Sequence, residues 1–175
     1  NWSIAKPNLF WTSILSYLDI NYSGNKNPAI SESENIYDKK FFPNLKLSYS
    51  ENIINNLNSI PILYVNEIGF KKYYSKEEVI HKVNLVAKYL RSIGVKKGDR
   101  VVGIVTNNAE TLISFLAVNS IGAVWSSCSP DFGEQAILDR FSQIEPKILF
   151  YSSSYMYGGK KFKILEKIKN VESKL

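Results

Sequence analysis

The sequence predicts an α/β fold in which an N-terminal helical cap and arm precede a β-hairpin and the βαβ units of a largely parallel sheet. From residue 61 onward, short apolar runs typical of buried strands alternate with amphipathic segments of helical periodicity. Residues 1–52 lack this alternation and combine an aromatic-rich amphipathic segment with a polar stretch. A hydrophobic content of 45% in 175 residues is sufficient for a buried core.

The first 40 residues are expected to form an amphipathic helix followed by an extended arm. Pro7 suits the first turn of a helix, and large apolar side chains recur on one helical face. These side chains are Trp2, Phe10, Trp11, Ile14, Leu15 and Leu18. Residues 22–40 are rich in Asn, Ser, Glu, Lys and Gly with few apolar anchors, which indicates a surface loop that wraps a larger body.

A hairpin and a long helix are expected next. Two strand-like runs, 61–65 and 70–74, flank a turn-sized spacer that contains glycine. Ser75 and Glu78 then have the spacing of a capping box, which marks the start of a helix. The apolar positions of this helix and its terminal glycine are Val79, Val83, Val86, Leu90, Ile93 and Gly94.

The rest of the chain alternates strand and helix at the spacing of βαβ units. The strands are expected at 100–105, 123–125 and 147–151, and the helices at 108–121, 134–144 and 161–169. Such a series favours a parallel sheet with right-handed crossovers. It has fewer strands than an open sheet usually contains, so we expect the chain to be part of a larger domain.

The segment after residue 125 is the most informative part of the chain. Small hydroxyl residues end the apolar run, Pro130 and Asp131 make a turn, and a helix restarts near Gly133. The resulting loop lies beyond the carboxyl end of a strand. In open parallel sheets, ligands bind at that edge.

Basic residues are concentrated near the C-terminal end. Lys and Arg outnumber Asp and Glu by 22 to 16, which gives a net charge of +6 and a pI near 9.2. The densest group is Lys160, Lys161, Lys163, Lys167, Lys169 and Lys174. We favour a solvated face of an amphipathic helix, and the sharper alternative is a contact for a phosphate-rich ligand such as coenzyme A or ATP. Nucleic acid is a weaker option, because no RNP-type or helix-turn-helix pattern is present.

Gly158-Gly159-Lys160-Lys161 is the nearest approach to a glycine-basic phosphate loop, since the P-loop and dinucleotide patterns are absent. Read functionally, free N–H groups at the start of the last helix would attract a phosphate with Lys160 beside them. We favour the simpler interpretation, which is a plain turn.

Metal binding and nucleophilic catalysis are not expected from these residues. Cys128 is the one cysteine and His81 the one histidine, too few for a disulfide framework or a zinc site, and we assign both to packing or the helix surface. Asp131, Glu134 and Asp139 suit a turn, a helix N-terminus and a local pair with Arg140.

No membrane segment is expected either. The apolar runs are far shorter than the roughly 20 residues that cross a bilayer, and no charged and apolar leader pattern opens the chain. We therefore expect a soluble, cytoplasmic protein with no membrane partner.

Four separate stretches resemble the AMP-forming acyl-CoA ligase superfamily, whose members form acyl-adenylates. They are Trp2-Ser3 with Pro7 and Phe10-Trp11; Phe42-Pro43 with Leu45, Tyr49, Glu51 and Asn52; Gly94-Val95-Lys96-Lys97-Gly98-Asp99-Arg100-Val101; and Ser129-Pro130-Asp131-Phe132-Gly133. The last of these is similar to the acetoacetyl branch rather than the acetyl branch. The resemblance spans nearly the whole chain, with residues 20–40 least informative.

This resemblance implies a two-step ligase of lipid metabolism with ATP, Mg²⁺ and coenzyme A. Acetoacetate, or a similar short acid, would attack ATP to give an acyl-adenylate, from which the coenzyme A thiol displaces AMP. It implies an N-terminal cap region at 1–52 and the incomplete start of an AMP-binding domain at 53–175. It also implies that the ATP loop, the hinge aspartate and the catalytic lysine lie downstream, so no catalytic residue is expected here and the piece alone is expected to be inactive.

Two places are implied as contacts of coenzyme A. Phe132 and Gly133 would border its channel, and Gly159 and Lys160 would lie near its nucleotide phosphate. An alternative is a free-standing, non-catalytic α/β module that binds an anionic ligand or a partner protein.

Overall fold

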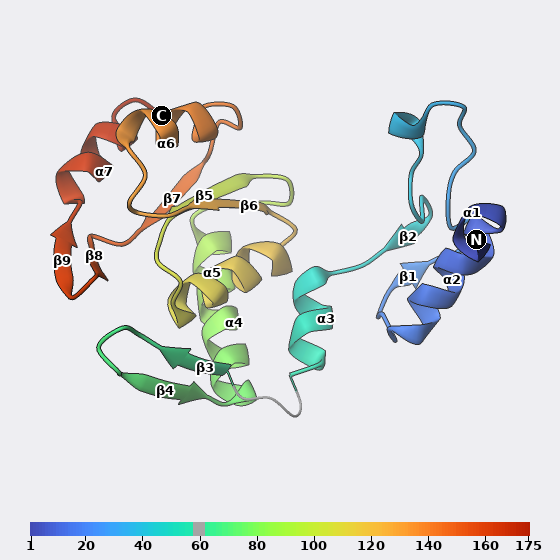
Figure 1. The fold of residues 1–175 in the computed structure, drawn as a ribbon, viewed down its shortest axis with the longest axis horizontal. Coiled ribbons are helices and arrows are strands. Elements are labelled where there is room, and N and C mark those ends of the chain that lie inside the picture. The colour runs from blue at the N-terminus through green and yellow to red at the C-terminus, as the bar shows by residue number, and fades with distance from the viewer. Residues whose placement is uncertain (58–61) are drawn as a thin grey trace. The chain divides into compact units, whose positions relative to one another are not determined.

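The computed structural model describes residues 1–57 and 62–175 (Figure 1). The chain divides into two compact units, Asn1–Asn52 and Ile53–Leu175, and each is described by itself. Pro61, the first residue of the predicted hairpin, lies outside the described residues.

The first unit is a short helical segment with an irregular arm. Its helices and strands are α1 (Trp2–Ala5), α2 (Pro7–Tyr17), β1 (Ser23–Gly24), the 3-10 helix η1 (Ile36–Asp38) and β2 (Leu45–Lys46). The expected helix is divided at Lys6, which has a non-helical φ of −138°. The division follows from Pro7, which has no N–H to donate and restricts the residue before it.

Aromatic side chains hold this unit together. Trp2, Phe10, Trp11 and Phe41 form a continuous series of edge-to-face contacts, with ring centroids 5.4, 5.2 and 5.1 Å apart. Asn52, in α3 (Tyr49–Asn55), donates to the carbonyl oxygens of Asn21 and Ser48 at 3.0 and 2.9 Å.

The second unit begins with the predicted hairpin and long helix. β3 (Ile62–Val65) and β4 (Lys71–Tyr74) pair antiparallel. α4 (Lys76–Ser92) follows, and the Ser75 hydroxyl accepts a hydrogen bond from the Glu78 N–H at 3.2 Å, as the capping-box spacing predicts. Gly94 ends the helix with a φ of +85°, a conformation that favours glycine.

A parallel sheet forms the centre of this unit, as predicted. β5 (Arg100–Ile104) lies between β6 (Val124–Cys128) and β7 (Ile148–Tyr151) and pairs with both in parallel. The predicted strand at 123–125 is therefore longer, because Ser126, Ser127 and Cys128 continue the ladder opposite β5.

Helices cover both faces of the sheet (Figure 1). α4 and α5 (Ala109–Ser120) pack on one face, where Leu90, Val101 and Val118 are buried together. On the other face, α6 (Glu134–Phe141) and α7 (Leu165–Glu172) pack on Val102 and Ile104. The chain crosses from β5 to β6 and then back past β5 to β7, so two crossovers of the same hand place α5 and α6 on opposite faces.

The structure corrects the last predicted helix. Residues 161–163 belong to a hairpin of β8 (Ser154–Tyr157) and β9 (Lys160–Lys163), and α7 begins only at Leu165. Gly158 and Gly159 make the turn with φ values of +56° and +75°, which a two-residue hairpin turn requires. The helix predicted at 134–144 is also shorter and ends at Phe141.

Candidate functional site

A cavity lies where the loops after β5 and β6 diverge. β5 and β6 are neighbours in the sheet, but the chain leaves β5 for α5 on one face and leaves β6 for α6 on the other. Such a reversal opens a crevice at the carboxyl ends of the strands, where open α/β sheets bind ligands. The cavity there measures about 390 Å³. Its lining residues are Thr106, Asn107, Ser129, Pro130, Asp131, Tyr155, Met156 and Tyr157.

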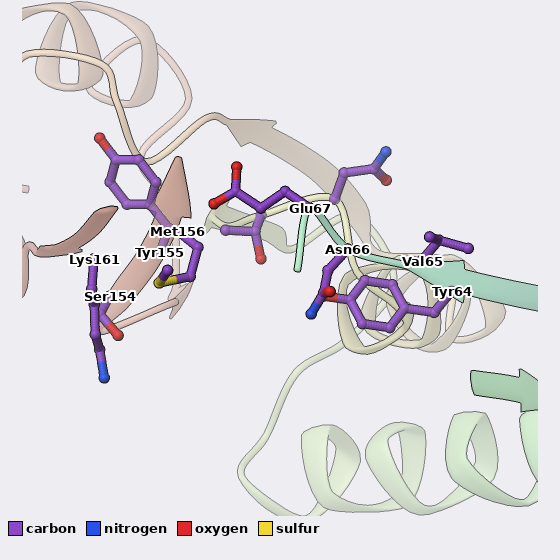
Figure 2. Close-up of a pocket in the computed structure, with 10 residues that line it drawn as sticks. Tyr64, Val65, Asn66, Glu67, Ser154, Tyr155, Met156 and Lys161 are labelled. Atoms are coloured by element: carbon purple, nitrogen blue, oxygen red, sulfur yellow. The ribbon is translucent and has the colours of Figure 1, made fainter. Parts of the chain in front are cut away.

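A second cavity, of about 480 Å³, adjoins the first and shares Thr106, Asn107, Tyr155 and Met156 with it. Figure 2 shows Tyr64 and Asn66 on one side, Ser154, Tyr155, Met156 and Lys161 on the other, and Glu67 between them. The β3–β4 and β8–β9 hairpins therefore extend the crevice beyond the edge of the parallel sheet.

The loop after β5 is fixed by hydrogen bonds from the start of α5. The side chain of Asn108 accepts from the Thr111 N–H at 2.9 Å and so caps the helix. The Thr111 hydroxyl donates to the carbonyl oxygen of Thr106 at 2.7 Å. One wall of both cavities is consequently attached to a buried helix.

The loop after β6 is fixed from α7. Lys167 donates to the carbonyl oxygens of Pro130 and Phe132 at 2.6 and 2.8 Å. The assignment of this lysine to a solvated helix face is therefore wrong, because its ammonium group is bound to a loop 35 to 37 residues earlier in the chain. Sequence reasoning could not find this contact, since both acceptors are main-chain atoms.

Of the four residues expected to contact coenzyme A, two follow the Pro130 turn. Phe132 is partly buried against the core of α6 and α7, and the Arg140 guanidinium lies 5.7 Å from its ring centroid. Gly133 is the N-cap of α6, and a Cβ added there would meet nothing within 4 Å. Both directly follow Asp131, which lines the first cavity.

The other two, Gly159 and Lys160, lie at the β8–β9 turn. The favoured interpretation, a plain turn, is confirmed, because the two glycines form the hairpin turn and α7 begins only at Leu165. The alternative of free N–H groups at a helix start is therefore wrong. The N–H groups of Gly158 and Gly159 donate to the two carboxylate oxygens of Glu67 at 3.0 and 3.3 Å. Lys160 is exposed at the first position of β9.

Comparison with known proteins assigns the family. The family model described as "AMP-binding enzyme" matches residues 62–175. The chain belongs to the AMP-binding enzymes. A curated acetoacetyl-CoA synthetase from Mus musculus is 39% identical over 98% of this chain and 26% of its own length. The acetoacetyl-coenzyme A synthetase of Rhizobium meliloti (strain 1021) is 35% identical over 100% of this chain and 27% of its own length.

A solved structure agrees with these relatives. The acetoacetyl-CoA synthetase from Streptomyces lividans superimposes with a TM-score of 0.93 and 30% identity, over 99% of this chain and 27% of that one. The mixed α/β fold predicted from the sequence is thereby confirmed. This AMP-binding enzyme chain spans about a quarter of the length of the relatives that it matches.

Side chains that could suggest other chemistry in this AMP-binding enzyme have structural roles. Burial raises the pKa of the Cys128 thiol, which keeps the sulfur protonated and apolar in its packing. Asp139 accepts from Gln135 at 2.7 Å, and the predicted pair with Arg140 is not among the described contacts. The described part of the chain contains neither a cluster of three metal-ligating side chains nor a helix long and apolar enough to span a membrane.

Proposed function

We propose that the intact protein containing this chain is an ATP-dependent ligase that joins acetoacetate, or a similar short acid, to coenzyme A and releases AMP. The proposal is supported most directly by identities of 35–39% across nearly the whole chain with proteins named acetoacetyl-CoA synthetase. The acid first forms an acyl-adenylate with release of pyrophosphate. The coenzyme A thiol then displaces AMP from that adenylate.

Within this activity we assign the chain to the coenzyme A side of the site. The proposed contacts are Phe132 and Gly133 beside the first cavity, and Gly159 and Lys160 at the β8–β9 turn. The chemistry of the turn fits an anionic ligand, because two consecutive main-chain N–H groups already bind a carboxylate there. The open space at Gly133 leaves room for a ligand to approach the backbone.

We further propose that ATP and Mg²⁺ are held mainly by residues that this chain does not contain. The domain assignment, a cap region at 1–52 and the start of the AMP-binding domain at 53–175, belongs to the same proposal. So do a cytoplasmic location and a set of partners limited to small molecules, without nucleic acid or membrane.

The deciding experiment is acid-dependent ATP–pyrophosphate exchange with the intact protein. We expect acetoacetate to support exchange better than acetate or longer acids, and coenzyme A to convert the adenylate to a thioester with release of AMP. The isolated 175-residue chain, assayed in parallel, is expected to give no exchange. An intact, folded protein that exchanges pyrophosphate with none of the acids would contradict the ligase assignment, and exchange by the isolated chain would contradict its predicted inactivity.

A further inference from the structure

Lys167, a residue of α7, connects this helix to the loop that follows β6. Its side chain is partly buried, and its ammonium group donates to Pro130 O at 2.6 Å and to Phe132 O at 2.8 Å. The two carbonyl groups belong to the residues before and after Asp131, which lines the first cavity. One ammonium group thus fixes the main chain before and after that position.

The loop makes few hydrogen bonds of its own. Pro130 has no N–H, and the described hydrogen bond within the turn is the 3.3 Å contact from the Phe132 N–H to Ser129 O. Gly133, the N-cap of α6, offers no side-chain cap. Hydrogen bonds from a charged donor are stronger than neutral ones, so Lys167 supplies the strongest described hydrogen bonds to the loop, in addition to the packing of Phe132 on the core.

The helix that carries Lys167 is itself well anchored. Ile168 and Val171 of α7 are buried against Ile137 and Phe141 of α6. One turn beyond Lys167, Asn170 donates to the Glu134 side chain at 3.0 Å. α7 therefore holds both the loop and the first turn of α6 in one fixed arrangement.

We propose that Lys167 is a positioning residue for the site at the β6–α6 loop. By holding the carbonyl groups of Pro130 and Phe132, it sets the course of the main chain through Phe132 and Gly133. It contacts no substrate and acts through the loop. The consequence for coenzyme A rests on the proposed function, in which Phe132 and Gly133 border the passage of that cofactor.

The test uses the intact protein with Lys167→Met, which keeps an apolar stem and removes the donor, and with Lys167→Arg, which keeps a charged donor. Lys169→Met, on the exposed side of the same helix, is the matched control. Hydrogen exchange of residues 129–133 is compared with that of β7 in the same sample. For Lys167→Met we expect about tenfold faster exchange in the loop with β7 unchanged, because loss of a local restraint opens the local segment only.

Kinetic measurements then show whether the position of the loop affects the binding of coenzyme A. In Lys167→Met we expect the KM for coenzyme A to rise about fivefold, while acid-dependent pyrophosphate exchange changes less than about twofold, and Lys167→Arg should recover most of the loss. Loop exchange that stays unchanged, or that rises equally in β7, would overturn the positioning role. Faster loop exchange with an unchanged KM for coenzyme A would support the positioning role and contradict the assignment of Phe132 and Gly133.

Discussion

Glu67, in the turn between β3 and β4, accepts a hydrogen bond of 3.0 Å from the main-chain N–H of Gly158, 91 residues further along the chain. Gly159 adds a second bond, of 3.3 Å, to the other carboxylate oxygen. The β8–β9 turn therefore binds an anionic group through its main-chain N–H groups, and that group is the carboxylate of Glu67. A phosphate oxygen accepts the same kind of bond, so a phosphate-bearing ligand would compete with Glu67 for these donors.

Replacing Glu67 is expected to loosen the turn and to favour a competing anion. In Glu67→Ala, hydrogen exchange at Gly158 and Gly159 should become faster, while the free energy of unfolding should fall by less than about 1 kcal/mol because the contact is exposed. If the same N–H groups contact coenzyme A, its KM should fall about threefold in the intact protein. Glu67→Gln, which keeps one acceptor oxygen, is the matched control. Unchanged exchange at both glycines would contradict the contact.

Replacing Lys160 is a second test of the proposed phosphate contact, in which the KM for coenzyme A is expected to rise instead of fall. Lys160→Ala in the intact protein should raise the KM for coenzyme A about fivefold and leave acid-dependent pyrophosphate exchange unchanged, because the lysine is assigned to the thioester step only. The effect should weaken at high salt, since the side chain is exposed. Lys169→Ala removes an exposed lysine of α7 as the control. A KM equal to that of the unaltered enzyme would remove Lys160 from the site.

The alternation of strands and helices was predictable because burial imposes it locally. The apolar run of β5 and the N-cap at Ser75 each act within a few residues, and the structure confirms both. The Pro130 turn was placed correctly at the carboxyl edge of the sheet for the same reason, since a parallel strand order follows from the alternation.

The errors arise where local signals compete or where the partner is remote. The glycine pair between Tyr157 and Lys160 is itself a hairpin signal, but the lysine-rich run that follows was interpreted as a helix face. The contacts of Glu67 and Lys167 end on main-chain atoms between 35 and 92 residues away. No spacing rule within a helix or strand encodes such contacts, so the structure was needed to find them.

Glycine is expected to be necessary at position 103, because the ring of Trp125 leaves too little room for a Cβ atom there. A Cβ added at Gly103 would lie 2.9 Å from two ring atoms of this tryptophan, whose ring also contacts Phe150 at a centroid distance of 5.8 Å. Gly103→Ala should therefore lower the free energy of unfolding by about 1–3 kcal/mol, measured by urea denaturation. In the double variant with Trp125→Leu the obstructing ring is absent, so the two losses should not add. Additive losses would show that the ring is not the cause.

Asp99 is expected to make the stability of the fold decrease as the pH falls into the acid range. Hydrogen bonds from the Lys147 ammonium group, at 2.9 Å, and from the Lys96 N–H, at 2.8 Å, lower the pKa of the Asp99 carboxyl group below its ordinary value. A carboxyl group whose pKa is lower in the folded state stabilises the fold above its unfolded pKa, and the stabilisation is lost as pH falls through the folded pKa. Urea midpoints measured between about pH 2.5 and 7 should therefore decline less steeply below about pH 4 in Asp99→Asn than in the unaltered protein. Lys147→Met, which keeps the carboxylate but removes its main partner, should reduce the same decline in part. An Asp99→Asn profile parallel to that of the unaltered protein would show that this carboxylate does not contribute.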